Sequence, residues 1–179
     1  YEFDSKQYNR EKEVYAACAA AVLYKKEILE KIGFLNEDFF MYYEDVEVSE
    51  RARLAGFKTF YSPKAVARHH HAFSSKESSA FFTYHVERGR LMHVFLNFPL
   101  RIFFQQYFYL LSINLAFLLK IFMNFHRFLS VFRSRKKPDG EPKFVRRIQT
   151  IKALSFFFIN FPQLYLKRWK MDGKRNRGV

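Results

Sequence analysis

The sequence predicts an α/β domain over residues 1–99, followed by a basic, aromatic-rich and membrane-associated helical region over residues 100–179. Three observations predict this division. Before residue 99, short apolar segments bounded by turn residues alternate with helical patterns. An uncharged run then covers residues 102–119. The charge balance also changes, because residues 1–119 carry 15 basic and 14 acidic side chains, whereas residues 120–179 carry 16 and 3.

The first expected strand covers residues 14–24, where small apolar side chains predominate, although alanine also favours a helix. Residues 25–32 predict a short helix, because apolar residues recur there at helical spacing, and Gly33 is a suitable stop. Residues 36–38 then predict a turn or a helix cap ahead of an aromatic run.

Residues 44–54 predict a helix that starts with acidic residues, which the helix dipole favours, and that ends before Gly56. Two short strands are expected after it, at residues 58–62 and 65–67. Residues 81–97 predict a longer helix. The order of strands and helices is the basis of the α/β prediction.

The second region has the features of a membrane protein. Residues 102–119 reach the threshold length of a membrane-spanning helix, although they include four polar side chains. A basic cluster at residues 127–137 is typical of the cytoplasmic side. Residues 144–169 mix basic and aromatic side chains and predict an interfacial amphipathic segment broken by Pro162. We therefore expect the cytoplasmic face of the plasma (inner) membrane, with peripheral attachment or one transmembrane helix, and an anionic membrane surface as partner.

Other classes of protein fit the composition less well. Cys18 is the single cysteine, so there is no intrachain disulfide and no cysteine-based zinc site. The chain starts at Tyr1 without a signal sequence, and we expect an internal or C-terminal piece of a longer protein. Nucleic-acid binding is a weaker alternative, because the basic residues lie among Phe, Leu and Ile and no recognition motif is present. We therefore expect no nucleic acid partner.

Glu44 and Asp45 are the candidate catalytic residues, and they directly follow the aromatic run at residues 39–43. A general base needs a carboxylate close to the hydroxyl that it deprotonates, with a pKa tuned by its neighbours. The alternative is an ordinary solvated first turn of a helix, where acids are common. Solvated turns rarely follow five consecutive aromatic and apolar residues, so the run favours the catalytic interpretation.

Histidines and arginines supply the other candidates. The three histidines at 69–71 follow the expected strands, and in an extended segment only one or two of them face a given site, so a metal ligand and a surface histidine are both open. Arg51, Arg88 and Arg90 suit bidentate contacts with phosphate oxygens, and the alternative is a surface or helix-pairing charge. Residues 74–79 form a polar loop, either a lid or an ordinary connection.

Taken in order, these motifs resemble a known family. Residues 16–97 resemble the C-terminal half of the catalytic domain of family 2 glycosyltransferases, and most closely the bacterial rhamnosyltransferase-like enzymes of cell-surface polysaccharide synthesis. The resemblance rests on the small-residue stretch at 17–24, the Gly-x-Phe-Asp-Glu-like turn at 33–37, the acids that follow the aromatic run, and the Arg-Gly-Arg-Leu sequence at 88–91. Each motif is weak alone, and the ordered set is fairly specific.

The resemblance implies a GT-A fold, in which helices enclose a Rossmann-like mixed sheet, and transfer of a sugar from a nucleotide-sugar donor to an acceptor hydroxyl with inversion. It implies Asp45 as the catalytic base, with Glu44 beside it in the acceptor site. His69 corresponds to a ligand of a divalent cation, Mg²⁺ or Mn²⁺, acting as a Lewis acid on the leaving diphosphate. Arg88 and Arg90 correspond to acceptor or phosphate contacts. A saccharide or a lipid-linked acceptor is the implied partner.

The chain departs from the family pattern in four respects. The usual glycine of the small-residue stretch is alanine, near Ala19, the turn has Asn36, and the third acid is Glu47 rather than aspartate. The chain also has no Asp-x-Asp, so we expect the nucleotide-binding half to lie outside it and the piece to be inactive alone. The alternative function is a non-catalytic membrane-binding module with basic amphipathic helices.

Overall fold

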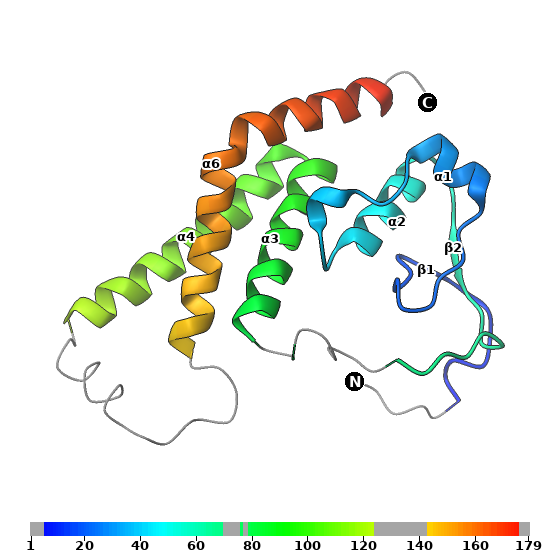
Figure 1. Ribbon diagram of the computed structural model, residues 1–179, viewed down its shortest axis with the longest axis horizontal. Coiled ribbons are helices and arrows are strands. Elements are labelled where there is room, and N and C mark those ends of the chain that lie inside the picture. The colour runs from blue at the N-terminus through cyan, green and yellow to red at the C-terminus, as the bar shows by residue number, and fades with distance from the viewer. Residues whose placement is uncertain (1–5, 70–75, 77–78, 124–142, 176–179) are drawn as a thin grey trace.

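The computed structural model describes residues 6–69, 76, 79–123 and 143–175, and these residues are mostly helical (Figure 1). In chain order the elements are β1 (Lys12–Val14), α1 (Lys26–Ile32), the short 3₁₀ helix η1 (Glu37–Phe39), α2 (Glu44–Leu54), β2 (Thr59–Tyr61), α3 (Ala80–Asn97), α4 (Leu100–Met123) and α6 (Lys143–Arg175).

The prediction of an α/β, Rossmann-like GT-A domain is wrong. Within the described residues the sheet consists of β1 and β2 alone, three residues each, paired antiparallel with Glu13 opposite Phe60. The strand expected at residues 14–24 does not form beyond Val14, and neither does the one expected at residues 65–67. A mixed sheet enclosed by helices is therefore not part of this fold.

The reason lies in how the segment after β1 uses its hydrogen-bond donors. This segment turns at residues 18–21, and its donors meet polar side chains on successive turns of helix α2. The contacts are Tyr15 hydroxyl to the Glu50 carboxylate, Ala17 N–H to Ser49 Oγ at 3.3 Å, and Ala19 N–H to Asp45 Oδ2 at 3.0 Å. Backbone groups that bind helix side chains are not available to a neighbouring strand. The small side chains thus allow close approach to a helix rather than a place in a sheet.

Most of the local predictions over residues 25–97 are confirmed. Helices α1, α2 and α3 and strand β2 lie within a residue or two of their expected ranges. Gly33 ends α1 with φ +88°, a conformation that favours glycine. Asn36 caps η1, because its side-chain Oδ1 accepts a hydrogen bond from the Asp38 N–H at 3.2 Å. These signals act over a few residues, which explains why sequence alone predicts them.

The core lies where α3, α4 and α6 meet, and α3 and α6 make the most extensive contact. Phe95 of α3, Phe103 of α4 and Phe157 of α6 are almost completely buried. The ring centroids of Phe95 and Phe103 are 4.9 Å apart in an edge-to-face arrangement, and those of Phe103 and Phe157 are 5.3 Å apart. The core therefore joins helices from both predicted regions.

Helix α6 continues through Pro162, where the sequence predicted a break. Proline has no N–H to donate to the preceding turn, and its ring crowds the carbonyl four residues back, so it kinks a helix without always ending it. Figure 1 shows α6 changing direction along its length. Its first half packs beside α3, and its second half passes over the top of the molecule in that view.

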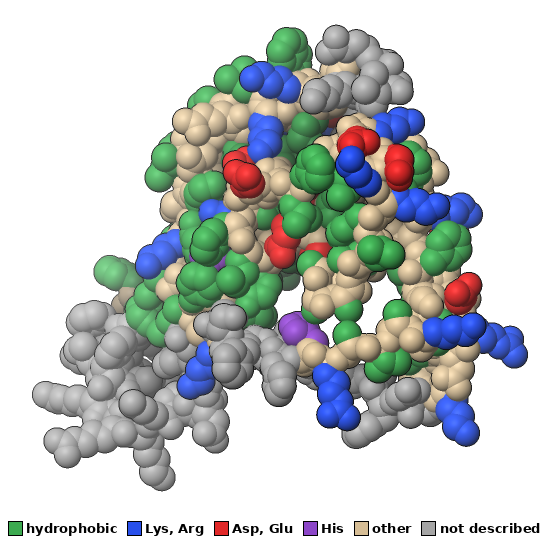
Figure 2. All heavy atoms as spheres, turned by 45° about the vertical axis from the view of Figure 1, so that its right-hand side comes forward, with side chains coloured by type: hydrophobic (Ala, Val, Ile, Leu, Met, Phe, Trp, Pro, Cys, Tyr) green, Lys and Arg blue, Asp and Glu red, His purple; other side chains and the backbone are tan. Residues whose placement is uncertain are grey.

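The apolar surface agrees with membrane association. Among the described residues, α4 is the one helix that is long and apolar enough to span a membrane, and only 17% of its most apolar window is buried. Large hydrophobic side chains are exposed along α4 and on the second half of α6: Ile102, Phe104, Phe108, Tyr109, Leu111, Leu115, Leu118, Leu119, Phe122, Met123, Phe158, Ile159, Tyr165, Leu166 and Trp169. Figure 2 shows hydrophobic side chains at the surface between basic ones.

Candidate functional site

A strained aromatic turn leads into the candidate carboxylates. Phe40, Tyr42 and Tyr43 have φ angles of 62°, 67° and 71°, in the region that non-glycine residues rarely adopt. Each such residue costs about 1–3 kcal/mol, and such residues cluster at functional sites because the surrounding structure must hold them there. Tyr43 is also the N-cap of α2, so the strained turn sets the direction in which Glu44 leaves the backbone.

Helix α3 holds this turn in place. A Cβ atom at Gly89 would lie 2.7 Å from the backbone oxygen of Tyr42 and 3.1 Å from Cβ of Tyr43, so only glycine permits this approach. The Tyr42 ring also packs edge-to-face on Phe82 of α3, with 5.0 Å between centroids. The strain is thus supported by tertiary packing rather than by the turn itself.

The two carboxylates have different surroundings. The half-buried Asp45 side chain accepts hydrogen bonds from two backbone N–H groups, that of Val46 at 2.8 Å and that of Ala19 at 3.0 Å. The Glu44 Oε2 atom is buried and has no hydrogen-bond partner among the described residues. Burial raises the pKa of Glu44, and the adjacent charge of Asp45 raises it further, against the opposing effect of a backbone hydrogen bond. Glu44 therefore keeps its proton to a higher pH than a solvated glutamate.

Tyr24 is a site residue that the sequence did not single out. Its hydroxyl is buried and has no hydrogen-bond partner among the described residues. Burial raises the pKa of Tyr24, and the charges of Asp45 and then Glu44 raise it further, against the opposing effect of Arg51. Buried polar atoms are nearly always paired, so the orphan atoms of Tyr24 and Glu44 mark a position for a ligand or water. The signal in the sequence that could have identified Tyr24 is its position at the end of the small-residue stretch. That position indicated the end of a strand instead.

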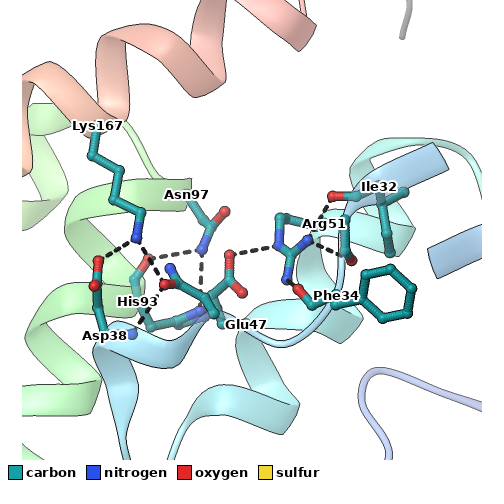
Figure 3. Close-up of polar contacts among 10 residues, drawn as sticks. Ile32, Phe34, Asp38, Glu47, Arg51, His93, Asn97 and Lys167 are labelled. Atoms are coloured by element: carbon teal, nitrogen blue, oxygen red, sulfur yellow. Dashed lines mark hydrogen bonds and ion pairs between the residues drawn. The ribbon is translucent and has the colours of Figure 1, made fainter. Parts of the chain in front are cut away.

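Arg51 uses its guanidinium within the protein, as Figure 3 shows. Nε donates to Oε1 of the fully buried Glu47 at 2.8 Å. Nη1 donates to the carbonyls of Ile32 at 2.6 Å and Gly33 at 2.9 Å, and Nη2 donates to that of Phe34 at 2.7 Å. Arg51 thus ties the end of α1 to α2. Its predicted role in binding substrate stays a prediction, and these contacts indicate a structural role.

Arg88 and Arg90 also have protein partners. Arg88 Nη2 donates to two carbonyls of η1, and its guanidinium lies 5.0 Å from the ring centroid of Phe156 on α6. Arg90 donates to Glu87 at 2.7 Å and to Gln106 of α4 at 2.9 Å. Their predicted contacts with acceptor or phosphate stay predictions, and in the structure they join α3 to η1, α4 and α6.

A polar clasp ties α6 to the loop before the carboxylates. Lys167 Nζ donates to Asn36 Oδ1 at 2.8 Å and to the Asp38 carboxylate, and Figure 3 shows this lysine reaching down from α6. Beside it, Asn97 Nδ2 donates to the carbonyl of His93 at 3.2 Å. The segment that precedes the strained turn is therefore connected to the second half of α6, where Leu166 and Trp169 are exposed.

The predicted cation site lies only partly within the described residues. His69 is exposed in the segment after β2, and the other two histidines of the run, with most of the expected lid at 74–79, lie outside the part of the chain that the structure describes. Within that part, no group of three or more His, Cys, Asp or Glu side chains could hold a metal ion. The divalent cation and its ligand His69 therefore stay predictions, and no step below uses a cation.

No protein-family model, curated protein or solved structure matches this chain. The site itself combines an oriented carboxylate at Asp45, a carboxyl group at Glu44 with a raised pKa, and the buried phenol of Tyr24. Such a set can accept a proton from a bound hydroxyl group and donate hydrogen bonds to it. The arrangement thus favours acid–base chemistry on an alcohol.

Proposed function

We propose that this chain takes part in glycosyl transfer to an acceptor hydroxyl at a membrane surface, with Asp45 as the base. The observation that carries the proposal is the strained turn that presents Glu44 and Asp45, together with the buried Tyr24 hydroxyl, which has no partner among the described residues and whose pKa the two acids raise. The ordered sequence motifs around the same turn add support, since they associate these acids with the acceptor side of family 2 glycosyltransferases. The proposal rests on this local site and not on the overall fold.

In the proposed reaction the acceptor oxygen attacks the anomeric carbon of a nucleotide-sugar. Asp45 takes the hydroxyl proton as the new carbon–oxygen bond forms. The bond to the diphosphate breaks, and the diphosphate leaves with the electron pair. The neutral phenol of Tyr24 donates a hydrogen bond that orients the acceptor, and the carboxyl group of Glu44 does the same in its protonated form.

The test is Asp45→Asn in the full-length natural protein in its membranes, assayed for sugar transfer from a panel of radiolabelled nucleotide-sugars. A general base contributes about 10²–10⁴ to the rate, so turnover should fall by at least about 100-fold. Glu30→Gln is the matched control, because Glu30 is exposed and pairs only with Lys26 of its own helix. Near-normal turnover in Asp45→Asn removes Asp45 from the chemistry.

The second candidate function is a non-catalytic membrane-binding module. The exposed apolar faces of α4 and α6 favour it, because soluble proteins rarely leave such continuous apolar surface uncovered. This candidate predicts no sugar transfer from any donor, together with binding to anionic vesicles that is the same for wild type and Asp45→Asn. The two candidates therefore differ in the outcome of the same pair of variants.

A further inference from the structure

A pocket of about 430 Å³ lies where α3, α4 and α6 meet. This volume is in the range of ligand sites, about 300–1,000 Å³. Four apolar side chains line it: Phe82 and Val86 of α3, and Leu110 and Ile113 of α4. The polar lining comes from Thr83 and Glu87 of α3 and from Arg146, Arg147 and Thr150 of α6. The pocket thus combines an apolar wall with a charged edge.

The charged edge has an excess of positive charge. Glu87 is neutralised by its ion pair with Arg90 at 2.7 Å. Arg146 and Arg147, which line the pocket from α6, have no acidic partner among the described residues. The Arg147 guanidinium lies 5.8 Å from the ring centroid of Phe117 on α4, and Arg146 is exposed at the surface. Both arginines line the pocket, and arginine is the side chain best suited to bind phosphate oxygens.

The surroundings of the pocket indicate where its ligand comes from. Leu110 and Ile113 belong to α4, the helix whose other side is an exposed apolar surface long enough to span a membrane. A pocket that is part apolar, part basic and adjacent to such a helix lies at the boundary between protein and bilayer. Basic pockets between membrane helices bind the head groups of anionic lipids.

We propose that this pocket binds one anionic phospholipid of the bilayer. The lipid phosphate contacts Arg146 and Arg147, and the part of an acyl chain next to the glycerol lies along Phe82, Leu110 and Ile113. This inference rests on the membrane association in the proposed function and not on the catalytic role of Asp45. Phe82 also packs on Tyr42 of the strained turn, so the bound lipid lies one aromatic ring away from the segment that carries the carboxylates.

Lipid titration of the full chain in a neutral detergent, read by native mass spectrometry, tests the proposal with phosphatidylglycerol as the probe. Wild type should retain one lipid. The double variant Arg146→Gln/Arg147→Gln should bind it about 30-fold more weakly, from the contribution of two basic residues to anionic lipid binding. The matched control is Lys152→Gln/Lys170→Gln, which removes the same charge from exposed positions of the same helix outside the pocket, and it should change binding by less than about threefold.

A second variant, Ile113→Trp, tests the apolar wall without changing charge. It should weaken retention of the lipid while the far-UV circular dichroism spectrum stays that of the wild type. Equal losses of lipid affinity in the arginine and lysine double variants would show diffuse electrostatic binding. Full retention of the lipid in both the arginine double variant and Ile113→Trp would place the lipid elsewhere. Either result overturns the proposal. Displacement of the lipid by inorganic phosphate at similar concentration would assign the site to free phosphate instead. None of these readouts depends on sugar transfer.

Discussion

Removal of the Arg51 guanidinium is the most informative test of how the site is held. In Arg51→Met the carboxylate of Glu47, which is 0% exposed, loses its charged partner. Breaking a buried ion pair by removing one partner costs about 3–5 kcal/mol. The carbonyls of Gly33 and Phe34 are exposed and can bind water instead, so they add little to the loss. We expect a decrease of about 3–5 kcal/mol in the free energy of unfolding, a large part of the typical 5–15 kcal/mol.

The chain offers a matched control for this experiment. Lys26 and Glu30 form an ion pair with the same spacing of four residues, at 3.3 Å, but their side chains are 79% and 53% exposed. Exposed helical pairs contribute about 0.3–0.5 kcal/mol, so Lys26→Met should change stability by no more than that. The assay is urea unfolding followed by far-UV circular dichroism at constant detergent.

The double variant Glu47→Leu/Arg51→Met separates the buried charge from the loss of packing. Because it leaves no unpaired charge in the interior, it should be more stable than Arg51→Met alone. If the free energies of unfolding of Arg51→Met and Lys26→Met differ by less than about 1 kcal/mol, the structural role of Arg51 is refuted. Its guanidinium is then available for the substrate contact that the sequence suggested.

Two further predictions concern the turn before α2. Gly89→Ala should destabilise the protein by about 1–2 kcal/mol, because overpacking against the Tyr42 backbone outweighs the roughly 1 kcal/mol by which alanine favours a helix. A free energy of unfolding equal to or above that of the wild type would contradict the close contact. Glu44→Gln should remove a pH dependence. The pKa of Glu44 is raised above 4.5 in the folded state, so the folded chain binds the proton more tightly, and stability is lost as pH rises from about 4.5 through the raised pKa. The variant should therefore gain stability relative to wild type as pH rises above about 4.5 in urea unfolding. Parallel profiles would contradict the burial of this carboxyl group.

The polar clasp joins the exposed apolar part of α6 to the loop before Glu44 and Asp45, and so links the proposed membrane contact to the candidate site. Lys167 binds Asn36 and Asp38, and the exposed Leu166 and Trp169 lie next to it on the same helix. In the proposed function, insertion of these apolar side chains into a bilayer would orient the strained turn relative to the membrane surface. This arrangement suits an acceptor hydroxyl that is carried by a lipid.

Local signals in the sequence predicted much of this structure. Helices α1, α2 and α3 follow from apolar spacing, from acidic residues at the first turn, and from glycines at 33 and 56 that end helices. The prediction of Glu44 and Asp45 as candidate site residues came from the apolar run that they follow, and it stays a prediction. The apolar stretch of α4 needs only a count of consecutive uncharged residues. Each of these signals depends on neighbours within one or two helical turns.

The overall fold and the partners of the polar side chains depended on contacts between distant residues. The stretch at 14–24 has the composition of a strand, yet its N–H groups bind Asp45 and Ser49 of a helix some thirty residues away. The same holds for Tyr24, whose hydroxyl matters only because packing buries it near two acids. Arginines attract carbonyls as readily as phosphates, so sequence cannot choose between these partners. Short-range composition therefore determined the helices and the carboxylate pair of this protein, whereas tertiary packing decided which groups are buried, paired or left without a partner, because those properties belong to the surroundings of an atom.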